Sequence, residues 1–195
     1  MRGIGFALAC LCVVAGCNVD TGIAPVEPTI KTCAKRDFGF AGKWQVVRKD
    51  SLHDRDPAPV AEIKFDADRD RFLVTYLSGY DDFKRFDVSF RTADLELELP
   101  YAIVEIEFTA PEEKGTFRRL AIAGIQDDKL AFYWLSGKEL AELMYLEEVG
   151  AVIERSNFST SVRCKPDDLL RVVRKHSKQL VGEPEYFHRI KAAAE

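Results

Sequence analysis

The sequence contains few residues whose types and spacing could support catalysis. His53, Asp54 and Asp56 share one polar stretch, where a histidine and a carboxylate partner could carry out acid–base chemistry. No nucleophile stands in a recognisable context such as Gly-x-Ser-x-Gly, and no phosphate loop or dinucleotide-binding fingerprint occurs. His176 falls in a basic helical stretch, and His188 falls in the C-terminal tail beside two aromatic residues. The sequence therefore predicts a protein that is not an enzyme, with no catalytic residues and no cofactor.

Three aspartates resemble the start of a calcium-binding loop. Asp66, Asp68 and Asp70 occupy alternate positions, as the first ligands of such a loop do. The sixth position is Arg71 instead of glycine and the twelfth is Leu77 instead of glutamate. We therefore expect a hairpin turn here. The cysteines and histidines also lack the spacing of a zinc site, so no metal site is predicted.

The N-terminal residues are typical of an export signal. Arg2 is followed by the uncharged stretch Ile4–Ala15, whose twelve residues span about 18 Å as a helix. This is too short to cross a bilayer comfortably and suits a secretory signal. The stretch ends in Val14-Ala15-Gly16-Cys17, which resembles the lipobox of bacterial lipoproteins. A plain signal peptide with an incidental cysteine is the alternative.

The lipobox resemblance implies a location and a modification. The signal would be cleaved before Cys17, whose thiol would carry a diacylglyceryl group and whose new amine would usually be acylated. The partner would then be a membrane, contacted through the lipid anchor, with the domain outside the cytoplasm in the cell envelope. In lipoproteins of enterobacteria an aspartate after the lipidated cysteine favours the inner membrane. Asn18 stands here, so the outer membrane is the expected location.

The remaining cysteines predict one disulfide. Of the five cysteines, Cys10 and Cys12 lie in the expected signal and Cys17 is the lipid site. Cys33 and Cys164 remain, and an exported compartment is oxidising. We therefore expect a Cys33–Cys164 disulfide, with two unpaired thiols as the alternative.

Chain length and net charge restrict the number of domains and the kinds of partner that are expected. A chain of 195 residues is expected to form one domain with appendages. The net charge of −4 argues against nucleic acid as a partner.

Period-two alternation predicts a β-rich domain. Apolar residues alternate with polar ones through most of the region from Gly42 to residue 135, as in antiparallel strands with one buried face. The expected strands number seven or eight and are about 43–49, 60–66, 71–77, 84–91, 94–99, 102–109, 116–126 and 129–135. The expected inward face comprises Trp44, Val46, Phe65, Phe72, Val74, Phe86, Val88, Val104, Ile106 and Phe108. We expect these side chains to fill most of the interior, with at most a shallow opening near residues 50–59.

Helical patterns follow the strands. Ser136 and Glu139 have the spacing of a capping box, which predicts a helix near 137–149. Pro166 suits the first turn of a second helix that ends at Gly182, and Glu185–Ala194 is expected to form a third, short one. The predicted organisation is a signal peptide (1–16), a lipidated tether (17–36), a β-rich domain (37–164) and a helical C-terminal tail (165–195).

The predicted fold is a small antiparallel barrel or strongly curved sheet with C-terminal helices. Gly42-Lys43-Trp44 on the first strand is similar to the Gly-x-Trp entry of lipocalins, although that family's Thr-Asp-Tyr motif is missing. The expected function is a membrane-anchored envelope lipoprotein with a non-catalytic interaction or structural role, whose candidate partner is another envelope protein. The lipocalin resemblance implies the alternative, a carrier of a small apolar molecule.

Overall fold

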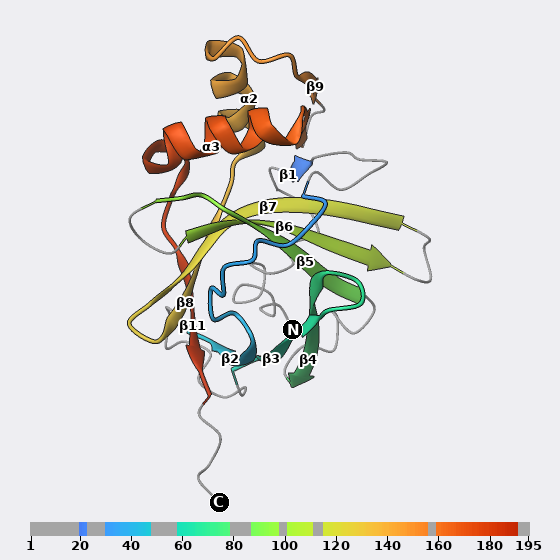
Figure 1. Ribbon diagram of the computed structural model, residues 1–195, viewed down its shortest axis with the longest axis vertical. Helices are drawn as coiled ribbons and strands as arrows, with labels where there is room; N and C mark the ends of the chain where they lie inside the picture. Colours follow the sequence, from blue (N-terminus) through green and yellow to red (C-terminus); the bar gives the residue numbers. More distant parts are fainter. Residues whose placement is uncertain are drawn as a thin grey trace, which may run out of the picture.

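Eight strands form a closed antiparallel barrel in the part of the chain that the structure describes (Figure 1). The structure is a computed structural model of the 195-residue chain, and it describes residues 20–22, 30–47, 58–78, 87–97, 101–110, 115–155 and 159–190. Around the barrel the strand order is β11-β2-β3-β4-β5-β6-β7-β8. The predicted fold class, a mainly β antiparallel barrel with helices near the C-terminus, is confirmed.

The strands of the barrel follow the hydrophobic alternation of the sequence. In chain order they are β2 (Gly42–Val46), β3 (Val60–Asp66), β4 (Arg71–Ser78), β5 (Asp87–Asp94), β6 (Tyr101–Ala110), β7 (Gly115–Gln126), β8 (Lys129–Trp134) and β11 (Glu185–Arg189). On β6, Val104, Ile106 and Phe108 are fully buried in the interior cluster, as period two requires. Most of the predicted inward face packs in this cluster. Phe65 is an exception, with 48% of its surface exposed, and Phe86 lies outside the described residues.

Two helices cover one side of the barrel (Figure 1). They are α2 (Gly137–Leu146) and α3 (Pro166–Leu180), and the Ser136 side chain accepts from the backbone N–H of Glu139 at the start of α2. The helices bury their apolar faces against outward residues of the barrel, forming an outer cluster that includes Ile103, Leu120, Ile122, Leu140, Met144, Leu169 and Val173. As a result β6 and β7 are buried on both faces in their central part.

A small sheet lies next to the helices. It consists of β1 (Asp20–Gly22), β9 (Val152–Arg155) and β10 (Ser159–Arg163), with β1 parallel to β10. Farther along the chain, Ile30 is buried in the outer cluster, and its N–H donates to the carboxylate of Glu105 on β6 at 2.8 Å. The described parts of the expected tether (17–36) therefore pack on the domain.

The expected third helix at the C-terminus is wrong. Residues 185–189 form strand β11, which pairs with β2 on one side and with β8 on the other. Phe187 enters the interior cluster, and the two neighbouring edge strands gain a shared partner. The separate strand expected at 94–99 is also wrong in its described part: β5 extends to Asp94, and residues 95–97 do not form a strand. Leu95 is instead buried in the outer cluster. The barrel thus reaches eight strands with β11 in the last place.

Candidate functional site

The interior of the barrel is closely packed. A cavity between interior side chains such as Trp44, Phe90 and Phe132 has a volume of about 20 Å³. That is room for about one water molecule, whereas a site for a drug-sized ligand requires about 300 Å³ or more. Aromatic contacts explain the filling: Phe72 and Phe90 stack with ring centroids 4.8 Å apart, and Phe40 meets both rings edge-on.

An arginine also faces the interior. Arg119 on β7 pairs with the inward-facing Ile106, so its side chain shares the inner face, and only 9% of its surface is exposed. Its guanidinium lies 4.4 Å from the centroid of the Trp134 ring, which is a close cation–π contact. The period-two pattern of the sequence does not single out Arg119 as an interior charge. This charge makes that part of the interior less suited to an apolar ligand.

A larger hollow lies on the outer surface of the barrel. We call it the outer hollow: it has a volume of about 560 Å³ and includes the outward side chains of Arg71, Leu73, Thr75, Ser89, Glu107 and Thr109, on β4, β5 and β6. Strands β4 and β5 pair over three residues each, up to Val74 opposite Val88. Thr75 and Tyr76 of β4 and Asp87 of β5, beyond these pairs, line the hollow. This is a different place from the shallow opening expected near residues 50–59, most of which lie outside the described residues.

Two arginines share one carboxylate at the outer hollow. Arg118 on β7 contacts a single oxygen of Glu107 through two nitrogens, with its Nε at 2.7 Å. Arg71 is held less tightly: its nearest nitrogen is 3.7 Å from the other oxygen of Glu107 and donates to the Ser89 hydroxyl at 3.3 Å. The Nε of Arg71 is buried and has no hydrogen-bond partner. Glu107 therefore compensates Arg118 more fully than Arg71, and Arg71 is the one of the two that lines the hollow.

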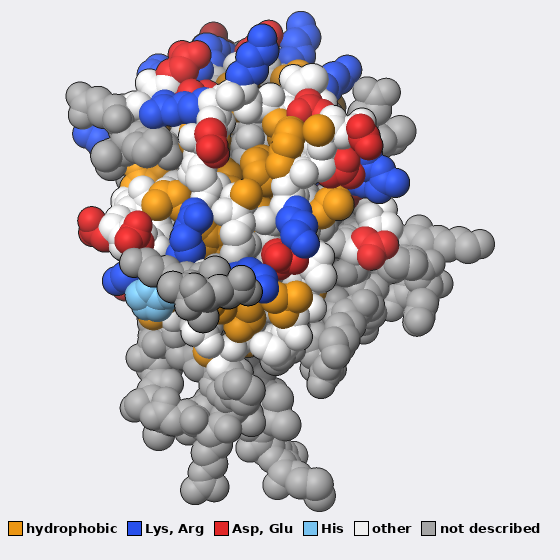
Figure 2. Space-filling view, turned by 60° about the horizontal axis from the view of Figure 1, so that its bottom comes forward, with side chains coloured by type: hydrophobic (Ala, Val, Ile, Leu, Met, Phe, Trp, Pro, Cys, Tyr) orange, Lys and Arg blue, Asp and Glu red, His pale blue; other side chains and the backbone are white. Residues whose placement is uncertain are grey.

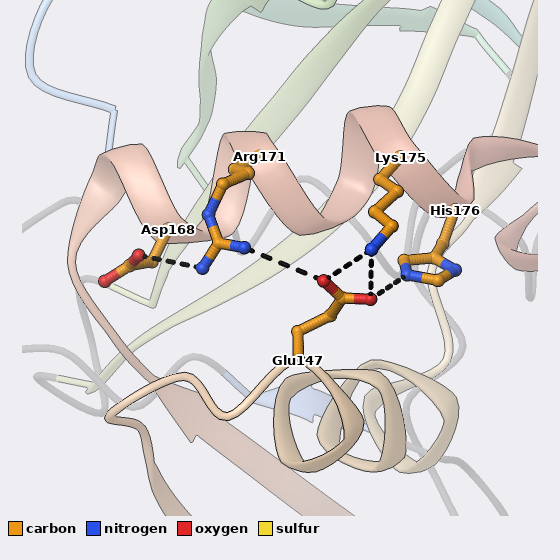
Figure 3. A network of polar contacts seen from close by, with 5 residues as sticks. All are labelled: Glu147, Asp168, Arg171, Lys175 and His176. Carbon is orange, nitrogen blue, oxygen red and sulfur yellow. Dashed lines mark hydrogen bonds and ion pairs between the residues drawn. The ribbon is translucent and has the colours of Figure 1, made fainter.

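A second polar cluster joins the two helices (Figure 3). Both carboxylate oxygens of Glu147, directly after α2, lie 2.8 Å from the ammonium of Lys175 on α3. His176 Nε2 lies 2.8 Å from one of these oxygens, and Arg171 is 3.7 Å from the other and also contacts Asp168. Lys175 and His176 are adjacent in sequence, and adjacent side chains of a regular helix point in different directions. Here the backbone of His176 is non-helical, and both side chains reach the carboxylate of Glu147. The cluster fastens α3 to α2.

The stability that Glu147 contributes should depend on pH. The hydrogen bonds from Lys175 and His176 lower the pKa of Glu147 below its ordinary value. Because the pKa of Glu147 is lower in the folded protein than in the unfolded chain, where it is about 4.3, the ionised carboxylate stabilises the folded protein at higher pH. This stability is lost as the pH falls through the pKa of Glu147 in the folded protein. We expect Glu147→Gln to melt at a lower temperature than the unchanged protein at pH 7, and the difference to shrink at pH 3.5.

Thermal unfolding followed by circular dichroism at the two pH values measures this effect. Glu142→Gln is the matched control, because Glu142 is exposed on α2, shortly before Glu147. A Glu147→Gln difference that stays constant across this pH range would contradict the assigned role.

The predicted Cys33–Cys164 disulfide is not formed in the structure. Both cysteines are free, and each is held by different neighbours. The Cys33 thiol donates to the carbonyl of Asp70 at 3.3 Å, beside the β3–β4 turn, whereas Cys164 packs in the outer cluster. Burial raises the pKa of both thiols, that of Cys164 to about 11. This shift is opposite to the one that activates a nucleophilic cysteine.

The other residues considered in the sequence are placed as follows. Cys17 and the loop with His53, Asp54 and Asp56 lie outside the described residues. The expected hairpin at Asp66–Asp70 is confirmed: the Asp66 carboxylate accepts from the N–H groups of Asp68 and Arg69, and β4 follows at Arg71. Among the described residues, no group of three or more histidines, cysteines or acids is arranged to hold a metal ion.

The outer surface carries mixed charges. Figure 2 shows acidic and basic side chains interspersed over one face, with hydrophobic side chains between them. Several charges are paired, as in Lys64 with Glu62 at 2.7 Å. In the part of the chain that is described, no helix has both the length and the apolar character needed to cross a membrane. Comparison with models of known families, with curated proteins and with solved structures finds no match to this chain.

Proposed function

We propose that the protein is a lipid-anchored envelope protein with a non-catalytic role, and that it makes its functional contacts through the outside of the barrel. The observation that carries the second part is the distribution of space. The interior cavity beside Trp44 and Phe132 has a volume of about 20 Å³, whereas the outer hollow has about 560 Å³ and presents charged and hydroxyl-bearing side chains. A binding partner therefore finds both room and polar groups on the outer surface.

The first part depends on the lipobox-like Val14-Ala15-Gly16-Cys17. Strand β1 begins at Asp20, three residues after Cys17, so at most about 10 Å of chain separates an anchor at Cys17 from the small sheet. Because β1 pairs with β10 and contacts α2, the helical side of the molecule would lie next to the membrane. This arrangement would hold the anchor close to the small sheet, whereas the sequence alone predicts an extended tether at residues 17–36.

Mass spectrometry of the natively expressed protein tests the anchor. We expect a mature N-terminus at Cys17 with a diacylglyceryl adduct. Cys17→Ser should leave the protein unprocessed or release it from the membrane fraction, because the modified atom is the thiol sulfur. Cys12→Ser is the matched control, since that residue would leave with the signal and should change nothing. An unmodified mature end that begins elsewhere would overturn the proposal.

The closed eight-stranded barrel is the observation that supports a second candidate function, the carriage of a small apolar ligand. Barrels of this strand number enclose one small ligand in some proteins and are filled by side chains in others. The small interior cavity and the buried Arg119 favour filling. An apolar molecule that is extracted from the purified protein in equimolar amount would favour the carrier instead.

A further inference from the structure

The outer hollow has features of a ligand site that the packing of the barrel does not require. Its volume of about 560 Å³ lies within the range of small-molecule sites, about 300 to 1,000 Å³. Leu73 supplies an apolar wall, and Thr75, Ser89 and Thr109 supply hydroxyl groups that donate or accept hydrogen bonds. The hollow thus combines apolar and polar contacts in one concave surface.

At the outer hollow two guanidinium groups share one carboxylate, and Arg71 is the less closely held of the two. Arg71 and Arg118 lie on either side of the single carboxylate of Glu107, and Arg118 makes the closer contacts with it. Arg69 and Asp87 also line the hollow, and Arg69 is paired with Asp66 at 3.9 Å. The carboxylate of Asp87 would repel an anion in the hollow, but Asp87 is exposed and the solvent screens its charge. Arg71 has 22% of its side chain exposed, and its contacts with the protein are long.

From this geometry we infer that the outer hollow binds a small organic anion, whose acidic group contacts Arg71 and whose body lies against Leu73 and the hydroxyl groups. A guanidinium suits this role because its planar donors match carboxylate and phosphate oxygens. The inference rests on the proposed function, which assigns contacts to the outside of the barrel, and deepens it by naming a ligand class. Lipid anchoring is not needed for the binding itself.

Isothermal titration calorimetry with phenyl phosphate tests the inference on the full-length protein in a non-ionic detergent. Phenol is the neutral comparison, because it has the ring without the anion. We expect saturable one-to-one binding of phenyl phosphate and no measurable binding of phenol at the same concentrations. Since the protein is already solubilised, the result does not depend on whether Cys17 is lipidated, and a failure here is distinct from a failure of anchoring.

Two variants and one control assign the binding to Arg71. Arg71→Gln should weaken binding at least tenfold, because it removes the cation. Glu107→Gln should strengthen binding, because it removes the competing carboxylate and keeps an acceptor for Arg118. Arg163→Gln is the control, since Arg163 is paired with Glu154 on the small sheet, and it should change the affinity less than twofold.

Three results would overturn the inference: no saturable binding, equal weakening by Arg163→Gln, or weaker binding by Glu107→Gln. The first would show that the hollow holds no anion of this kind. The second would show that only general surface charge attracts the probe. Circular dichroism spectra confirm folding, and if Arg71→Gln does not fold, the direction of change in Glu107→Gln decides.

Discussion

Replacing Trp44 by alanine should lower the free energy of unfolding by about 3 to 5 kcal/mol, the range for removing a large aromatic side chain from a core. Only 1% of Trp44 is exposed, and its indole N–H donates to the carbonyl of Phe40 at 2.8 Å. The guanidinium of Arg189, at the end of β11, lies 4.5 Å from the ring centroid. The substitution would therefore remove a ring that joins the first and last strands of the barrel. Urea unfolding followed by near-ultraviolet circular dichroism measures the loss.

Two controls separate the parts of this effect. Trp44→Phe retains a ring but removes the N–H donor, and it should cost less, about 1 to 3 kcal/mol, the range for leaving a buried acceptor unsatisfied. Tyr145→Ala removes an aromatic side chain that is 81% exposed, and it should change the stability by less than about 0.5 kcal/mol. Equal losses for Trp44→Ala and Tyr145→Ala would show that Trp44 has no special structural role.

The Gly42-Lys43-Trp44 motif illustrates what a local pattern predicts well. Trp44 was expected to be a large core aromatic, and it is buried with Phe38 and Phe40 in the interior cluster. Gly42 has a φ of +143°, a backbone conformation that side chains rarely allow, so glycine is required for conformational reasons. Both properties depend on residues that are near in sequence, and the alternation that follows is also local. The sequence therefore predicted the barrel fold and most of its inner face.

The outer hollow was not predictable in the same way. Arg71, Ser89 and Glu107 come from three strands, and each reads in the sequence as an ordinary solvent-facing position. Their meeting depends on the register of β5 with β6, in which Ser89 pairs with Glu107, and on where β4 and β5 cease to pair. Strand register is set by turns and by the packing of the whole sheet. Glu147 and His176 present the same difficulty, because the packing of α2 against α3 brings them together.

Strand β11 shows how a local reading gave the wrong element. Residues 185–194 were expected to form a helix, but Tyr186, Phe187 and His188 are placed between two strands that would otherwise be unpaired edges. Phe187 pairs with Val46 of β2 and with Leu130 of β8, so one residue contacts the first and last strands of the meander. The strands that stabilise β11 by pairing with it are distant from this segment in sequence, so the local pattern of residues 185–194 does not reveal the pairing.

Truncation after Pro184 should therefore abolish cooperative folding. It removes β11, exposes the edges of β2 and β8, and opens the interior cluster beside Phe132, whose ring centroid lies 5.9 Å from that of Phe187. Unpaired edges of this kind promote association between chains. We expect the truncated protein to elute as aggregate in size-exclusion chromatography and to show no sharp thermal transition by circular dichroism.

The matched control for this truncation ends the chain after Ile190. It keeps β11 and the hydrogen bond from the N–H of Ile190 to the carbonyl of Lys43 at 2.8 Å, and it removes residues that the structure does not describe. We expect this shorter truncation to melt within a few degrees of the full chain. Phe187→Ala tests the same contact without removing the strand, and it should cost about 3 to 5 kcal/mol because it leaves a cavity in the interior cluster. If the chain truncated after Pro184 stays monomeric and unfolds cooperatively near the temperature of the full chain, β11 is not what closes the barrel.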